Sequence, residues 1–198
     1  YVVLGDDFRF GADRQGDIAF IREQGLRNGY ATGSTPTFAV QGERVSSTRI
    51  REALENADFS AAEALLGRPY SISGRVIFGR QLGQVIGTRT ANLQLRRLRA
   101  PLSGVYTVEV SGGGLHSAPG VANVGVRPTV DDSIRANLEV HLLDREIDLY
   151  GRHIEVTFRH KLREEMKFGS VAELRENIAR DIEKTRAWFS RGQNSKKI

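Results

Sequence analysis

The pattern of hydrophobic positions in this chain changes near residue 68. Before that point the pattern alternates between strands and helices. The apolar run at residues 1–4 is typical of a buried parallel strand, and Ile18, Ile21 and Leu26 follow at helical spacing behind a capping Asp17. Residues 38–45 predict another strand, and helices are expected from Ser46 and over residues 60–67. The first third therefore predicts an α/β arrangement.

After residue 68 the period is that of β-strands. Alternating apolar and polar positions predict strands over residues 70–78, 104–110, 115–126, 138–143 and 154–159, the third interrupted at Pro119-Gly120. Short strands at this spacing with few helices favour a small antiparallel barrel. Ser170 and Glu173 then form a capping box, and an apolar stripe follows through Ile182. That final helix is expected to pack on the barrel, and residues 191–198 are predicted to be a flexible tail.

Composition excludes several classes of protein. The chain is 39% hydrophobic and 27% charged, as in ordinary globular domains. Neither a leader pattern nor a run of about 18 apolar residues occurs, so a cytoplasmic protein without a membrane partner is expected. The lack of cysteine excludes disulfides and thiolate chemistry. The net charge of +5 suits an anionic partner, but acidic residues alternate with the basic ones, so nucleic-acid binding is not expected.

A glycine-rich stretch is the first candidate for chemistry. Gly79, Gly83 and Gly87 recur every four residues ahead of Thr90-Ala91-Asn92. Backbone N–H groups in such a loop can converge on an anion, and Thr90 and Asn92 offer neutral oxygens to a hard cation. The stretch has neither the P-loop pattern nor the dinucleotide fingerprint. It predicts either a site for a nucleotide triphosphate with its metal or an ordinary hairpin.

The helix expected from Ser46 begins in an unusual way. Ser47 and Thr48 can cap its free N–H groups, but Arg49 and Arg51 place positive charge at the positive end of its dipole. An anion such as phosphate would stabilise that combination. The alternative is a plain cap with solvated arginines.

Taken in order, these segments resemble a known family. Residues 70–189 resemble the riboflavin kinase domain, and residues 1–66 resemble the end of the flavin adenylyltransferase domain in bacterial bifunctional riboflavin kinase/FAD synthetases. The matching segments are GDDFRFG (5–11), VSSTRIREAL (45–54), GQVIGTRTANL (83–93), GVYTVEV (104–110), GVANVGVRPT (120–129), LEVHLLDREIDLYG (138–151), KLREEMKFGSVAEL (161–174) and IARDIEKTR (178–186).

The resemblance implies an α+β protein with two parts. Residues 68–190 would form a riboflavin kinase-type antiparallel β-barrel with a C-terminal helix. Residues 1–67 would be the end of a Rossmann-like α/β nucleotidyltransferase domain, whose N-terminal strand and His-x-Gly-His motif are absent from this sequence. The kinase would make FMN from riboflavin and ATP, and the adenylyltransferase would join AMP to FMN, giving FAD.

The resemblance also implies roles for particular residues. Thr90 and Asn92 match the family's magnesium and ATP-phosphate ligands, and Gly79, Gly83 and Gly87 would cover the nucleotide. Glu139 matches the catalytic base, and Arg163 lies in the flavin-side loop. Small-molecule substrates and Mg²⁺ are therefore expected. Without the resemblance, Glu139 would be interpreted as a solvated strand residue, and a non-catalytic flavin- or nucleotide-binding barrel is the alternative function.

Two departures from the family pattern limit these expectations. Thr88-Arg89 replaces the usual Phe-Pro, so a poorer KM for ATP is expected. All four histidines lie between His116 and His160, outside the adenylyltransferase part. The residual site there would consist of Asp7 and Phe8 on the flavin side and Ser47, Thr48 and Arg51 on the phosphate side. We expect this chain to make FMN but not FAD, and the complete protein to make both. His141 and the acids of REEM, Glu164 and Glu165, are predicted to be structural or surface residues.

Overall fold

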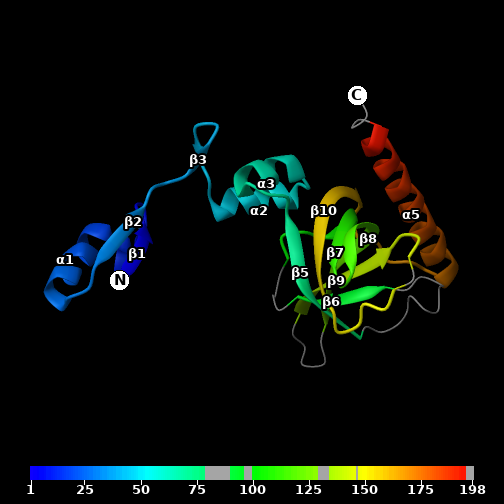
Figure 1. Cartoon of the computed structure of the whole chain (residues 1–198), viewed down its shortest axis with the longest axis horizontal. Coiled ribbons are helices and arrows are strands. Elements are labelled where there is room, and N and C mark those ends of the chain that lie inside the picture. The colour runs from blue at the N-terminus through cyan, green and yellow to red at the C-terminus, as the bar shows by residue number, and fades with distance from the viewer. Residues whose placement is uncertain (79–89, 96–99, 129–133, 146, 195–198) are drawn as a thin grey trace. The chain divides into compact units, whose positions relative to one another are not determined.

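The computed structural model describes residues 1–78, 90–95, 100–128, 134–145 and 147–194 (Figure 1). The chain forms two compact units, Tyr1–Arg49 and Ile50–Ile198. Their division falls inside helix α2 (Ser47–Glu55), whereas the sequence predicted a boundary at residues 67 and 68. Helix α3 (Phe59–Leu66) lies in the second unit together with most of α2. The reason is burial, because Leu54 and Ala62 of these helices belong to that unit's hydrophobic core.

The first unit contains a parallel strand pair joined by a helix. Strands β1 (Val2–Gly5) and β2 (Thr32–Thr35) pair in register from Val2 opposite Thr32, and α1 (Ile18–Asn28) connects them after a short 3-10 helix, η1 (Ala12–Arg14). Asp17 caps α1 as predicted, because its Oδ1 accepts a hydrogen bond from the Phe20 N–H at 2.9 Å. Strand β2 was not predicted from the sequence.

Residues 38–45 differ from the single strand that the sequence predicted. They form a hairpin of β3 (Ala39–Val40) and β4 (Glu43–Arg44). Gln41 and Gly42 both take positive φ, 54° and 78°, and this reverses the chain.

The second unit is a closed six-stranded antiparallel barrel, which confirms the predicted fold (Figure 1). The strand order is β10-β5-β6-β9-β8-β7. The bounds are β5 (Ser71–Ile77), β6 (Ala91–Gln94), β7 (Gly104–Gly112), β8 (Leu115–Pro128), β9 (Ile134–Leu142) and β10 (His153–Arg163). Strand β8 continues through Pro119-Gly120, where an interruption was predicted. Strands approach closely there, since a Cβ on Gly120 would lie 2.9 Å from the His141 carbonyl oxygen.

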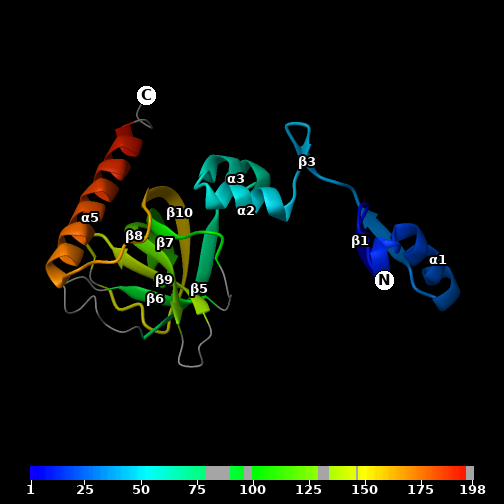
Figure 2. The same cartoon turned by 180° about the vertical axis from the view of Figure 1, so that it is seen from behind.

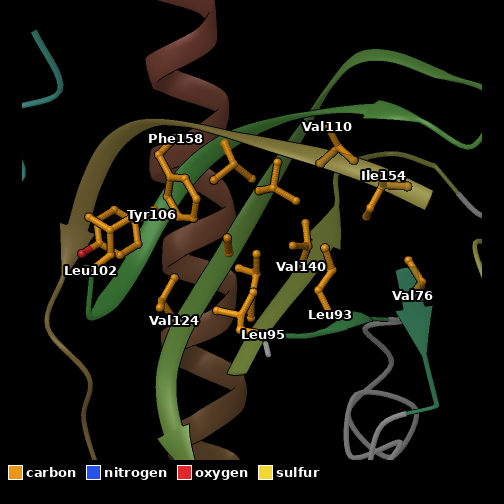
Figure 3. Packing of buried hydrophobic residues seen from close by; sticks show 14 of the residues in the cluster. Val76, Leu93, Leu95, Leu102, Tyr106, Val110, Val124, Val140, Ile154 and Phe158 are labelled. Atoms are coloured by element: carbon orange, nitrogen blue, oxygen red, sulfur yellow. The ribbon is translucent and has the colours of Figure 1, made fainter. Parts of the chain in front are cut away.

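Alternate strand residues fill the barrel, and an aromatic cluster closes one end (Figure 3). Val108, Leu138 and Ile154 have no exposed surface. Phe158 lies edge-on to Tyr106 with ring centroids 5.4 Å apart, and Phe59 of α3 lies 5.9 Å from Tyr106. Burial raises the pKa of the Tyr106 phenol to about 12, and its hydroxyl donates a hydrogen bond to the Ser103 carbonyl at 2.6 Å.

Helix α5 (Val171–Asn194) packs on the outer face of β7 and β8 (Figure 2). The Ser170 hydroxyl accepts from the Glu173 N–H at 3.1 Å, as the predicted cap requires. A buried hydroxyl pair, Thr107 and Thr185, joins α5 to β7 at 3.1 Å. The helix extends through Asn194, into the stretch predicted to be a tail. In the described part of the chain, no helix combines the length and apolar character needed to cross a membrane.

Candidate active site beside helix α5

A cavity of about 160 Å³ lies between the outer face of the barrel and α5. Three residues that the sequence assigned to the site, Thr90, Glu139 and Arg163, line this one cavity. The strands contribute mostly polar side chains, whereas α5 contributes apolar ones that include Leu174 and Ile178, together with the charged Asp181. A largely apolar molecule that carries polar groups suits such a cavity.

Glu139 sits in a row of polar side chains on the outer face of the sheet. Its neighbours in β9, Leu138 and Val140, point into the core with at most 1% of their surface exposed. Across the adjacent strands Glu139 faces Asn92 of β6 and Asn123 of β8. The Asn137 side-chain amide donates a hydrogen bond to Glu139 Oε1 at 3.0 Å. The carboxylate is thus half-buried, held by an amide and directed toward the cavity.

Thr90 and Asn92 lie at the start of β6, next to this row. Asn92 is buried with 7% of its surface exposed, and its side-chain nitrogen donates to the Thr90 carbonyl at 3.5 Å. That contact turns the amide nitrogen toward the backbone and leaves the amide oxygen for another partner. Gly79, Gly83 and Gly87, together with Thr88 and Arg89, lie outside the described residues.

An irregularity at the end of β10 positions Arg163. The pairing of β10 with β7 shifts by one residue between Lys161 and Arg163. On the partner strand, Gly104 has φ +113°, and a Cβ there would lie 2.5 Å from the Arg163 carbonyl oxygen. The close approach therefore requires glycine. Beyond the irregularity, the Arg163 guanidinium contacts the carboxylate of Asp181 on α5 and lies 5.6 Å from the Phe168 ring centroid.

Gly104→Ala is expected to lower the free energy of unfolding by about 2–4 kcal/mol, because it combines a strained φ with a backbone clash. Urea denaturation measures the change. Gly67→Ala is the matched control, since Gly67 also has positive φ but has nothing within 4 Å of its added Cβ. Gly67→Ala should lower the free energy of unfolding by about 1–2 kcal/mol. Equal losses in the two variants would contradict the role assigned to the close approach.

Several cavity residues were not predicted from the sequence. Glu165 is exposed, as predicted, but it also lines the cavity. Its Oε1 accepts from the Asn123 side-chain amide at 3.4 Å and lies over Gly125, where the lack of a Cβ leaves room for it. His141, predicted to be structural, also lines the cavity. Asp181 carried a usable signal. It follows Leu174 by seven residues, so a charged residue occupies the apolar stripe of α5.

The residues assigned to a residual adenylyltransferase site fall on both units. Asp7, Phe8, Ser47 and Thr48 belong to the first unit, and Arg51 to the second. Asp7 forms an ion pair with Arg44, and Phe8 stacks on Phe10 with centroids 5.8 Å apart.

At the start of α2, the Ser46 hydroxyl accepts from the Arg49 N–H at 3.3 Å. The Arg49 guanidinium pairs with Glu43 at 2.6 Å. The Glu43 carboxylate thus neutralises part of the positive charge for which the sequence suggested a phosphate.

A larger cavity, of about 810 Å³, runs along β5. Arg68, Arg75 and Glu155 contribute to its described lining, which contains none of the residues assigned to the site. Cavity volume alone would therefore select a different place from the one where Thr90, Glu139 and Arg163 meet. Among the residues that the structure describes, no group of three or more histidine or acidic side chains is arranged to hold a metal ion.

Comparison with known proteins matches both parts of the chain. The sequence model of the riboflavin kinase family matches residues 66–189, and that of FAD synthetase matches residues 1–49. The bifunctional riboflavin kinase/FMN adenylyltransferase of Escherichia coli (strain K12) is 51% identical over 189 residues, which cover 96% of this chain and 60% of that protein. The protein of the same name from Pseudomonas fluorescens is 50% identical over 187 residues, covering 94% and 60%.

The chain thus spans about 60% of the length of these curated relatives. The crystal structure of a macrolide-efflux protein from Streptococcus pneumoniae shares the fold, with a TM-score of 0.68 and 33% sequence identity. The matched region covers 93% of this chain and 59% of the Streptococcus pneumoniae chain.

Proposed function

This chain belongs to the riboflavin kinase family, and on that premise we propose that the cavity beside α5 is where it transfers the γ-phosphoryl group of ATP to the ribityl 5′-hydroxyl of riboflavin. The observation that carries the proposal is the meeting of Glu139, Thr90 and Arg163 in one cavity, although 73 residues separate the first and last of them along the chain (163 − 90). A polar wall and an apolar wall together suit a flat flavin ring with a hydroxylated side chain.

Glu139 would act as the general base. Phosphoryl transfer depends mainly on alignment and charge neutralisation, so a carboxylate that orients the attacking hydroxyl and accepts its proton is sufficient. The Asn137 amide occupies one carboxylate oxygen, Oε1, and thereby limits rotation of the group. The proton of the 5′-hydroxyl would pass to the Glu139 carboxylate as the oxygen bonds to phosphorus and ADP leaves.

Thr90 and Asn92 would hold Mg²⁺ together with the phosphate oxygens of ATP. Mg²⁺ prefers oxygen ligands and keeps several waters, so two neutral side-chain oxygens fit it without a cluster of acids. The orientation of the Asn92 amide supports this, because its nitrogen already bonds to the Thr90 carbonyl. The ion would supply neutralisation of phosphate charge.

The test is FMN formation from riboflavin and ATP, followed by chromatography. With excess Mg²⁺ the chain should produce FMN, and removal of the metal with EDTA should lower the rate by at least about 100-fold, because charge neutralisation is a main requirement of phosphoryl transfer. Restored Mg²⁺ should restore the rate. A full rate in EDTA would contradict the metal assignment. Riboflavin binding without any FMN would instead support a non-catalytic flavin-binding barrel.

The match of residues 1–49 to FAD synthetase favours a second activity in the complete protein, adenylylation of FMN to FAD. Incubation of this chain with FMN and MgATP tests whether residues 1–198 carry that activity, and no FAD is expected. Small molecules are the proposed partners and the cytoplasm the proposed location. Nucleic acid is not a proposed partner, because acidic residues alternate with the basic ones along the chain.

A further inference from the structure

Among the residues whose burial is described, Asp181 is the only charged one that is buried, at 3% exposure. A buried carboxylate is costly unless it is paired and hydrogen-bonded, so its surroundings must compensate for the lost hydration. Asp181 lies on α5 and lines the cavity that contains Glu139. The mechanism proposed above gives it no role, although it is the partner of Arg163.

The contact between the two side chains fixes the guanidinium closely. Arg163 Nε lies 3.0 Å from Asp181 Oδ2 and 3.3 Å from Oδ1, and the Arg163 NH2 group lies 2.9 Å from Oδ2. The remaining terminal nitrogen, NH1, donates to the Glu164 carbonyl at 3.0 Å. Such multiple contacts on a planar group determine its orientation as well as its position.

The carboxylate is itself held in place by the attachment of α5. One helical turn after Asp181, the buried hydroxyl pair of Thr185 and Thr107 fixes the helix on β7. At the other end of the contact, the close approach at Gly104 fixes the Arg163 backbone. Both partners are therefore set by the fold before any ligand arrives.

The cavity also contains acidic side chains that would attract the Arg163 guanidinium. Glu139 and Glu165 line the same cavity as Arg163, together with His141. Without Asp181, the Arg163 guanidinium would be attracted toward those carboxylates. Pairing with Asp181 both neutralises the guanidinium and keeps it away from the proposed base.

We propose that Asp181 is a positioning residue, which holds Arg163 against the cavity wall so that the riboflavin site is formed in advance. The proposal rests on the proposed function, because it takes riboflavin as the ligand. A preformed site lowers the ordering cost of binding, so loss of Asp181 should weaken riboflavin binding more than it slows the chemical step.

A double-mutant cycle separates positioning from a general structural effect. Asp181→Asn, Arg163→Gln and the double variant are compared by riboflavin fluorescence quenching and by steady-state kinetics. Asp181→Asn should raise the riboflavin dissociation constant about tenfold, with kcat changed by less than about threefold. The double variant should bind no more weakly than Arg163→Gln alone, because Asp181 acts through Arg163. Additive effects on binding would overturn the proposal.

Glu183→Gln is the matched charge control, because Glu183 lies two residues further along α5 and its side chain is 70% exposed. It should leave riboflavin binding unchanged.

Removing one partner of a buried ion pair can prevent folding, so a second variant is needed. Arg163→Met with Asp181→Leu removes both charges, should melt near the wild type and should bind riboflavin as weakly as Arg163→Gln. Wild-type affinity in this folded variant would also overturn the proposal. A wild-type chain that neither binds nor phosphorylates riboflavin would contradict the proposed function itself.

Discussion

Glu139→Gln is expected to lower kcat for FMN formation by about 10²–10⁴-fold, the usual contribution of a general base, while riboflavin binding stays within about twofold. The substitution keeps the shape of the side chain and an oxygen that can accept from the Asn137 amide, which bonds to Glu139 Oε1 in the structure. It removes the capacity to accept the proton of the attacking hydroxyl. Rates come from FMN chromatography, and affinity from quenching of flavin fluorescence.

Glu155→Gln is the matched control for this variant. Glu155 is also a glutamate on a barrel strand, but it accepts a hydrogen bond from the Ser71 hydroxyl at 2.6 Å and does not line the cavity beside α5. Its kcat should equal that of the wild type. A Glu139→Gln enzyme with normal turnover would refute the assignment of the base. Loss of riboflavin affinity without loss of turnover would assign Glu139 to binding instead.

Phe158→Ala is expected to have the largest effect on stability and to lower the free energy of unfolding by about 3–5 kcal/mol. Phe158 is 1% exposed and contacts the rings of Tyr106, Phe59 and Tyr70, so truncation leaves a cavity where α3 closes the barrel. Urea denaturation can be followed by fluorescence of the single tryptophan, Trp188, which lies on α5.

Phe78→Ala provides the comparison, because Phe78 is 66% exposed and contacts Tyr150 at the barrel surface. Phe78→Ala should lower the free energy of unfolding by less than about 1.5 kcal/mol. A Phe158→Ala variant no less stable than Phe78→Ala would show that the aromatic cluster does not support the barrel.

The strand pattern predicted most of the barrel, because alternation is a direct consequence of one face being buried. It failed where backbone geometry decides the structure. Gln41-Gly42 turns the chain through positive φ, which period alone does not reveal. Pro119 stays within β8 because the residues on both sides of it, as well as Pro119 itself opposite Glu109, are in register with β7. The order in which the six strands close into a barrel was not predicted, since many topologies satisfy the same alternation.

The candidate site was predictable only in part. Pattern alone cannot separate Glu139 from a solvated strand glutamate such as Glu155, and the resemblance to the family made that distinction. Glu165 was missed because its position depends on the space above Gly125, a contact between distant segments. Asp181 was missed because a single polar residue in an apolar stripe identifies an exception without identifying its partner.

The closing strand of the barrel has a consequence for biosynthesis. Strand β10 pairs with β5 on one side and β7 on the other, and its Glu155 bonds to Ser71, 84 residues earlier. A nascent chain that has not yet released β10 from the ribosome leaves two sheet edges unpaired, and such edges invite association with other chains. The α5 wall of the cavity is synthesised later still. Kinase activity should therefore appear only when nearly the whole domain has emerged from the ribosome. Until then, the unpaired edges of β5 and β7 are surfaces that chaperones would need to protect.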